Sequence, residues 1–500
     1  MAGPTRRFLV LGLDGGTFDL LDPLFEAGEL PFLRSLVHRG VRAPLRSVYP
    51  AKTIPAWFSF ATGQDPGELG IFGFTEPDGR PGRSRTVRSF RPAEALWDRL
   101  SRLGVKVGVL NFPMTAGYPL HGFILPGMFS EGSATYPQRL RSEVTSAIGA
   151  DYPGELPTFR ESERDAWVGA ATRAIEQRAK VAATLAERHR PDFLFALFRE
   201  TDRLEHQLWG ELSRPVAQIP PDLLEFWRTV DRACRDVDSA FRAGGGASVT
   251  LVISDHGHGP IHSDFLTNRW LADEGLLVFR RGSELARRQV ISQLALRTQQ
   301  LPLAGALARR IADFLRDGRH AALADLISGD ASFERAAARI DWKRTVAFSY
   351  PVPEGIYLNP FNPDLTPARR EELTREIRSR LERFPDAHIE VFSPEQFYRG
   401  KNLELAPTLL IRVDDMKTEP RMDFGYPQPL IRDRPQFFYG SGTHRMNGIL
   451  IAAGDGVRPG RMEGTPDLLD IAPTVLEAMG LPSAPRMTGR SLARDLGLAA

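Results

Sequence analysis

The sequence predicts an α/β protein, a three-layer sandwich in which a mostly parallel sheet lies between two layers of helices. Continuous apolar runs such as RFLVLGL (7–13) and SVTLVI (248–253) are typical of strands that are covered on both faces. Amphipathic helical stretches precede such runs, for example 221–242 before the second of them. Because parallel strands are usually joined by helices, this alternation favours a mostly parallel sheet.

The other elements follow the same alternation along the chain. After the first strand a helical pattern runs to Gly40, which ends it. We then expect a helix at 94–103 and a strand at 105–110, a helix at 164–189 and a strand at 192–198, a hairpin at 345–359, a helix at 366–384 capped by Thr366, strands at 407–414 and 448–454, and a closing helix at 465–482 capped by Thr465.

The stretch from 280 to 340 interrupts this order. It is helical in pattern, rich in arginine and without a strand signal. We therefore predict a core over 1–279 and 341–500, with 280–340 as a helical cap or insertion. Its basic helices are either a solvated surface or a surface that faces an anionic substrate or membrane.

The bulk composition is that of an ordinary globular protein. Of 500 residues 42% are hydrophobic and 25% charged, and the formal net charge is +2, so no basic excess points to specific nucleic-acid binding. The single cysteine, Cys234, excludes an intramolecular disulfide. No apolar run approaches the roughly 20 residues of a membrane span, and 7–13 is interpreted as a strand, so we expect a cytoplasmic protein. The oligomeric state stays open.

Side chains of the kind that bind metal ions gather where predicted strands end. They are Asp14 after the first strand, Asp202 and His206 after 192–198, Asp255 and His256 after 248–253, and His444 before 448–454. Because ligands gather at the carboxyl ends of parallel strands, the first three groups are expected to converge. Carboxylates combined with imidazoles suit Zn²⁺ or Mn²⁺. Each piece alone is better explained by a turn or a surface ion pair, so the metal site rests on their joint occurrence.

Thr53 is the candidate nucleophile. It lies in YPAKTIPAWFSFATG (49–63), directly after Lys52 and before a predicted helix. A hydroxyl at a helix N-terminus beside a cation can be activated for attack on phosphorus, and the helix end favours a phosphate. The same position also suits a threonine that caps the helix, and the two roles are compatible.

Together these segments resemble the alkaline phosphatase superfamily. Within it the chain is most similar to the type I phosphodiesterase/nucleotide pyrophosphatase branch and to the bacterial phosphohydrolase/phosphomutase proteins. The matching blocks keep the family's order over nearly the whole chain: GLDGGTFD (12–19), YPAKTIPAWFSFATGQDPGELGIFGF (49–74), ETDRLEHQLW (200–209), SDHGHGP (254–260), GTHRMNGILIAAG (442–454) and DLLDIAPTVLEAMGLP (467–482).

The resemblance implies an alkaline-phosphatase-like fold and a hydrolase with two divalent ions, Zn²⁺ or, as the alternative, Mn²⁺. One ion would be bound by Asp202, His206 and His444. The other would be bound by Asp14, Asp255 and His256, with Thr53 completing its shell. A small phosphodiester would then be cleaved by way of a phospho-threonine on that residue.

The chain departs from the family pattern beside the nucleophile. Nucleotide phosphodiesterases have Phe-Pro-Asn there, and this chain has Ile-Pro-Ala at 54–56, so the asparagine that donates to a phosphoryl oxygen is missing. Lys52, Asn111 and Arg445 are the candidates to replace it in substrate binding. His258 stands where the family has a large, often apolar residue, so it is not expected to be a ligand. A structural role is favoured, with lining of the pocket as the alternative.

Other functions share parts of this pattern. A phosphomonoesterase could use the same site, and so could a phosphoglycerate-mutase-like phosphotransferase, which would need a serine nucleophile and a larger insertion before Asp202. A sulfatase is excluded because it needs a modified Cys or Ser where this chain has Thr53. A metal-bound binding protein without catalytic activity is a further class, against which the complete ligand set weighs.

Overall fold

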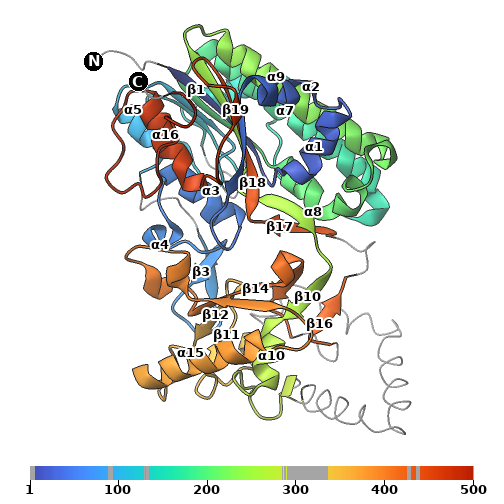
Figure 1. Ribbon diagram of the computed structural model, residues 1–500, viewed down its shortest axis with the longest axis vertical. Helices are drawn as coiled ribbons and strands as arrows, with labels where there is room; N and C mark the ends of the chain where they lie inside the picture. The colour runs from blue at the N-terminus through green and yellow to red at the C-terminus, as the bar shows by residue number, and fades with distance from the viewer. Residues whose placement is uncertain are drawn as a thin grey trace.

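Two lobes make up the described part of the chain. The computed structural model describes residues 6–87, 94–128, 130, 134–283, 285, 286, 289, 336–424, 429–434 and 440–498. The upper lobe in Figure 1 holds a central sheet with helices on both sides, and the lower lobe is built around a second sheet.

The central sheet confirms the predicted α/β class. The described residues give it eight strands in the order β19 (Gly460–Arg461), β2 (Val41–Arg46), β18 (Asn447–Gly454), β8 (Ser248–Ile253), β1 (Arg7–Leu13), β7 (Phe193–Phe198), β5 (Val107–Leu110) and β6 (Gly122–Leu125). From β8 to β6 all neighbours are parallel, whereas β18 runs antiparallel to both β2 and β8.

Alternate residues of β1 face the two helical layers, as a strand that is buried on both sides requires. Phe8 and Val10 belong to one cluster of buried side chains, and Leu9 and Leu11 belong to the other. The first cluster includes α3 (Thr53–Thr62), α5 (Leu96–Arg102) and α16 (Ile471–Ala478); the second includes α1 (Phe18–Glu26), α2 (Pro31–Arg39), α6 (Leu140–Ile148), α7 (Arg164–His189) and α9 (Pro221–Arg242). The three-layer sandwich is therefore confirmed (Figure 1).

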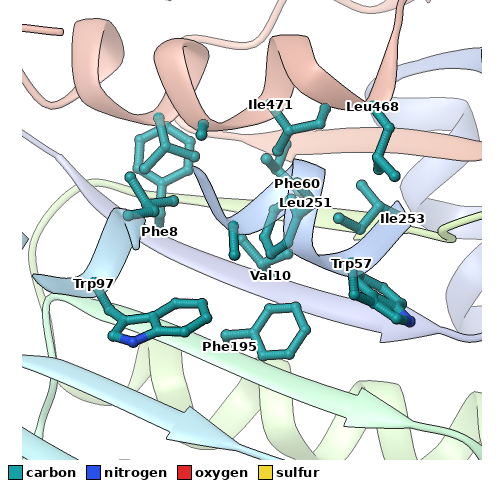
Figure 2. Packing of buried hydrophobic residues seen from close by; sticks show 14 of the residues in the cluster. Phe8, Val10, Trp57, Phe60, Trp97, Phe195, Leu251, Ile253, Leu468 and Ile471 are labelled. Carbon is teal, nitrogen blue, oxygen red and sulfur yellow. The ribbon is translucent and has the colours of Figure 1, made fainter. Parts of the chain in front are cut away.

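Helix α3 is fixed on the sheet by aromatic side chains (Figure 2). The rings of Trp57 and Phe60 lie 5.6 and 5.3 Å from the ring of Phe195 on β7, measured between centroids. Trp57 fits there because residue 12 is glycine, since a Cβ on Gly12 would lie 2.9 Å from the indole ring. Burial of each such ring contributes roughly 1.5–3 kcal/mol, so the start of α3 is held firmly against β1 and β7.

Local details differ from the sequence prediction at two places. The helical pattern that ends at Gly40 forms two helices, because the chain turns at Gly28, whose φ is 77°, and Pro31 begins α2. Near the C-terminus, Asp470 and not Thr465 is the N-cap of α16, after a short turn of 3-10 helix at Leu468–Asp470.

The lower lobe surrounds a seven-stranded sheet of the described residues. Six strands follow the order β11 (Ala347–Phe348), β12 (Gly355–Leu358), β14 (Leu409–Val413), β15 (Thr418–Arg421), β10 (Ser263–Leu266) and β16 (Ile431–Asp433), and β13 (Ile389–Phe392) pairs with β14. Helices α10 (Thr267–Asp273) and α15 (Pro367–Glu382) pack against it. Thr366 caps α15 as predicted, since its hydroxyl accepts from the Arg369 N–H.

The predicted helical cap at 280–340 lies mostly outside the described residues and stays a prediction. Its two ends are described, and they meet in an antiparallel bridge between Phe279 and Ile340. The chain therefore leaves the lower lobe and re-enters it at one point, as an insertion would. In the described parts of the chain, no helix is long and apolar enough to cross a bilayer.

Candidate active site

Three parallel strands bring the predicted acids together. Strands β8, β1 and β7 are neighbours in the sheet. Asp255 follows the carboxyl end of β8, Asp14 follows that of β1, and Asp202 lies after β7 in the first turn of α8 (Glu200–Leu212). The Thr201 hydroxyl donates to the Asp14 carbonyl over 2.6 Å, which fixes the start of α8 to the end of β1. The predicted convergence of these three groups is confirmed.

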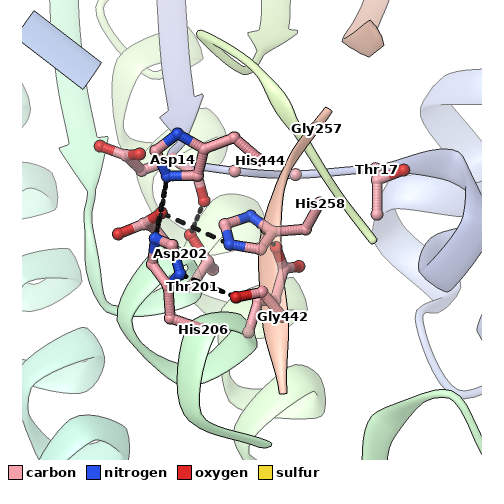
Figure 3. Close-up of polar contacts among 12 residues, drawn as sticks. Asp14, Thr17, Thr201, Asp202, His206, Gly257, His258, Gly442 and His444 are labelled. Carbon is pink, nitrogen blue, oxygen red and sulfur yellow. Dashed lines mark hydrogen bonds and ion pairs between the residues drawn. The ribbon is translucent and has the colours of Figure 1, made fainter. Parts of the chain in front are cut away.

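A two-stranded ribbon adds the distant histidine. Strand β9 (Gly257–Pro260) pairs antiparallel with β17 (Gly442–Arg445), and His444 lies directly opposite His258 in the register. Residues opposite each other in such a pair place their side chains on the same face. His444 thereby joins groups that come from strand ends in the central sheet (Figure 3).

The first group of candidate ligands, here called the strand-end half, comprises Asp14, Asp255 and His256. Their ligand atoms lie within 4.8 Å of one another, and all three side chains are fully buried. The His256 Nε2 is 3.2 Å from Asp255 Oδ2 and 3.7 Å from Asp14 Oδ1. The Trp57 indole N–H donates to Asp14 Oδ2 over 3.1 Å, and the Gly15 N–H donates to Asp255 Oδ1.

The second group, here called the ribbon half, comprises Asp202, His206, His258 and His444. The Asp202 Oδ1 lies 3.3 Å from His206 Nε2 and 3.4 Å from His444 Nε2 (Figure 3). The two halves adjoin, because the rings of His256 and His444 stack with centroids 3.6 Å apart.

Both halves have the chemistry of a cation site. Buried atoms without a hydrogen-bond partner include Asp14 Oδ1, Asp202 Oδ1, Asp255 Oδ2 and His256 Nε2. His206 and His444 each turn Nδ1 to a backbone carbonyl, which can only accept, so in the neutral rings the lone pairs lie on Nε2. Those two Nε2 atoms are 2.8 Å apart, and a shared cation removes the repulsion between their lone pairs. The residues therefore fit divalent metal ions.

Electrostatics separate the two halves. Burial, and then the nearby Asp202 charge, raises the pKa of Asp14 to about 8 in the metal-free protein. Burial likewise raises the pKa of Asp255 well above its usual range. Burial would also raise the pKa of Asp202, but the His206 and His444 imidazoles lower it well below its usual value. The strand-end half thus lacks positive charge of its own.

Thr53 is the first residue of α3 and is 4% exposed. Lys52, not Thr53, is the N-cap of the helix, so the capping alternative does not hold. Two contacts place this segment at the cluster: the Ala51 carbonyl accepts from His444 Nδ1, and Trp57 donates to Asp14. The predicted nucleophile therefore lies between two residues that contact the two halves.

The sequence matches the family model for type I phosphodiesterase/nucleotide pyrophosphatase over residues 8–414. The chain belongs to that family. No curated protein matches the sequence. The family interpretation made from the sequence motifs is confirmed, and the chain is a metal-dependent phosphoric ester hydrolase.

Solved structures of this superfamily share the fold. Phosphonoacetate hydrolase from Sinorhizobium meliloti 1021 is 16% identical with a TM-score of 0.55, and the match covers 94% of this chain and 95% of that one. The alkaline phosphatase PafA is 13% identical, with a TM-score of 0.55 over 99% of this chain and 100% of that one. Human ectonucleotide pyrophosphatase/phosphodiesterase 5 is 11% identical, with a TM-score of 0.53 over 98% and 99%. The alkaline-phosphatase-like fold is thereby confirmed.

The three predicted substrate residues occupy different settings in this family member. The Lys52 ammonium pairs with Glu354 of the lower lobe over 2.7 Å, and Lys52 lines a small cavity together with His444. Asn111 is tied into the framework, since it donates to the Leu197 carbonyl and its side-chain oxygen accepts from Tyr152 and Arg178.

Arg445 lies on β17 next to His444, and its guanidinium is occupied by the backbone of its own ribbon and its surroundings. It donates to the carbonyls of Met416, His444 and Pro260. Burial lowers the pKa of Arg445 to about 10. Lys52 thus lines a cavity together with a candidate metal ligand, His444.

Sequence reasoning set His258 aside as structural, yet its ring lies in the ribbon half. Its Nε2 is 3.8 Å from Asp202 Oδ1 and its ring is fully buried. The local pattern SDHGHGP holds no signal for this, because the position depends on the pairing of β9 with a strand far along the chain. The position of His258 beside Asp202 could be inferred only from the register between β9 and β17.

Proposed function

We propose that the chain is a phosphodiesterase with two divalent ions that acts through a phospho-threonine on Thr53. Asp202, His206 and His444 would hold one ion, and Asp14, Asp255 and His256 the other. The observation that carries the proposal is two adjoining groups of mostly buried ligand atoms, contacted by Ala51 and Trp57 on either side of a threonine that begins a helix. Mixed carboxylate and imidazole ligands favour Zn²⁺, with Mn²⁺ as the alternative.

The reaction would proceed in two displacements on phosphorus. The Thr53 Oγ1 attacks, its bond to phosphorus forms, and the bond to the first alcohol breaks. Water then attacks the phospho-threonine, and the monoester leaves as the hydroxyl of Thr53 is restored. Ions held by the two groups of ligands would supply positive charge that acidifies the hydroxyl and stabilises the leaving oxygen. The N-terminus of α3 adds favourable charge for the phosphoryl group.

Of the three predicted substrate residues, Lys52 fits this reaction best. Lys52 directly precedes the nucleophile in the sequence, and the Glu354 carboxylate of the lower lobe pairs with its ammonium. Lys52 would thus stand in for the asparagine that Ala56 replaces, while Asn111 and Arg445 would hold the surrounding backbone. A small phosphoester suits this buried site better than a polymeric nucleic acid.

Two measurements test the proposal. Metal-stripped protein reloaded with Zn²⁺ or Mn²⁺ should turn over bis-p-nitrophenyl phosphate with a higher kcat/KM than p-nitrophenyl phosphate. A reversed preference would favour a phosphomonoesterase or a phosphotransferase with the same metal centre. No turnover of any phosphoester by fully loaded protein would support the binding-protein alternative.

The nucleophile is tested separately. Thr53→Ala should lower kcat on the order of 10⁴-fold or more, because removal of a nucleophile abolishes the covalent route. Acid quenching during turnover, followed by peptide mass spectrometry, should find a phosphoryl group on Thr53 of the native protein. Thr184→Ala, on the distant helix α7, is the matched control and should keep both rate and adduct. A phosphoryl group found on another residue would contradict the assignment.

A further inference from the structure

A buried carboxylate and a buried histidine lie against the ribbon half and have no part in the reaction described above. Glu205 is on α8 between Asp202 and His206, and it faces His258 on β9. Both side chains are fully buried. The His258 Nδ1 lies 3.0 Å from Glu205 Oε2, a close polar contact between two buried atoms that have no hydrogen-bond partner among the described residues. Neither residue belongs to the ligand set that the family resemblance implies.

The three rings of the ribbon half are set up in the same way. Each presents Nε2 to Asp202 Oδ1, at 3.3 Å for His206, 3.4 Å for His444 and 3.8 Å for His258. Each also turns Nδ1 to an oxygen of the protein. For His206 and His444 that oxygen is a backbone carbonyl, and for His258 it is the carboxylate of Glu205.

This arrangement directs the lone pair of His258. Nδ1 faces the Glu205 oxygen at 3.0 Å, and a proton held on Nδ1 leaves Nε2 free to bind a cation. An outer contact from a carboxyl group orients an imidazole ligand and raises its basicity. Both ring nitrogens of His258 are buried without a hydrogen-bond partner among the described residues, and burial of such a polar atom is costly unless something else binds it.

The backbone is shaped around the pair. Gly15 has a φ of 74°, and a Cβ on it would lie 2.5 Å from His258 Nδ1 and 3.1 Å from Glu205 Oε2. A side chain at position 15 would therefore displace the pair. The turn after β1 thus holds His258 and Glu205 in place as well as carrying Asp14.

We propose that His258 is a fourth protein ligand of the ion held by Asp202, His206 and His444, and that Glu205 orients His258 for this role. The inference rests on the proposed metal centre. Catalytic zinc sites generally have three protein ligands and an open position, and they can expand to five ligands, so a fourth protein ligand favours tighter retention and still leaves a position for a substrate oxygen. The ribbon half is then the tighter of the two halves.

The test uses the full-length protein, stripped of metal and titrated with Co²⁺ and Zn²⁺. Co²⁺ absorption in the visible range reports the ligand set, and competition with a chromophoric chelator gives the Zn²⁺ affinity. His258→Gln should change the spectrum of the tighter site and weaken its affinity by roughly 100-fold or more. Glu205→Gln should weaken it by about 10- to 100-fold, the usual effect of a group that orients a ligand. His262→Gln, an exposed histidine on the same segment, should change neither.

Folding is controlled through circular dichroism and thermal unfolding of the metal-free proteins. If either single variant fails to fold, the double variant Glu205→Gln/His258→Gln places two amides that can hydrogen-bond to each other, and it should show the loss of affinity expected for removal of His258. Variants that fold and keep the native spectrum and affinity would overturn the inference and leave the pair structural. Native protein that binds no divalent ion would instead overturn the proposed function.

Discussion

The two halves of the candidate metal centre are built from different kinds of structure. In the strand-end half, Asp14 and Asp255 follow neighbouring parallel strands, so the central sheet itself sets their separation. In the ribbon half, His258 and His444 come from a two-stranded ribbon outside that sheet. The first half is thus fixed by the core of the fold. The second depends on one long-range pairing, so it can differ between relatives that share the core.

The charges differ in the same sense. The ribbon half holds three imidazoles around one carboxylate, and the strand-end half holds two carboxylates beside one imidazole. An ion therefore stabilises the strand-end half mainly by neutralising buried negative charge. In the ribbon half the ion mainly removes the repulsion between the Nε2 lone pairs of His206 and His444, which face one another. Removing one ligand from each half is the most direct way to separate these roles.

The largest effects on activity and metal content are expected from Asp255→Asn in the strand-end half and His444→Gln in the ribbon half. Each is expected to lower kcat/KM on the order of 10²–10³-fold, because each removes charge stabilisation at the same phosphoryl group. Each should also lower the bound metal from two ions per chain to one, measured by inductively coupled plasma mass spectrometry after dialysis. The exposed Asp386→Asn is the control and should retain both ions. Two ions retained in Asp255→Asn would show that the strand-end half is not a metal site.

The difference between the halves also marks what the sequence could predict. Asp14, Asp202 and Asp255 were found because continuous apolar runs end at them, and the ends of parallel strands meet at one edge of a sheet. His206 followed from its spacing, one helical turn after Asp202. These are local patterns, and the structure brings all four residues to one place.

Long-range pairing accounts for what the sequence did not show. The apolar pattern indicates neither the opposition of His258 and His444 nor the closeness of Glu205 to His258, because both depend on register between distant segments. The sequence predicted β11, β12 and β14 of the second sheet as a hairpin and a strand, but it did not show that they form a separate sheet, because the strands are two to five residues long and their partners are far apart in the chain. His444 was assigned to an ion only through the resemblance to the family, whose known ligand set already reflects this long-range pairing.

A smaller effect is expected from Trp57→Phe. The indole N–H donates to Asp14, so its loss leaves a buried carboxylate oxygen without that partner while most of the packing is kept. Zn²⁺ affinity of the strand-end half should fall about 10-fold, as for other groups that orient a ligand. The ribbon half should keep its affinity, which a two-step chelator competition would resolve. Equal weakening of both halves would mean that Trp57 acts through the fold as a whole.

The smallest effect is on the pH dependence of stability without metal. The pKa of Asp14 is about 8 in the folded protein and about 4 when unfolded, so the folded state binds more protons between these values. Stability from this group is complete below pH 4 and is lost as the pH rises towards 8. The metal-free protein should therefore melt roughly a few degrees lower at pH 8 than at pH 5, and Asp14→Asn should reduce that difference.

Asp202 has a lowered pKa, so its contribution to stability is lost only as the pH falls below about 4. Since a bound ion replaces the proton on Asp14, the rise in melting temperature on adding Zn²⁺ should be larger at pH 8 than at pH 5. An equal rise in melting temperature at both pH values would mean that the ion does not replace the proton on Asp14.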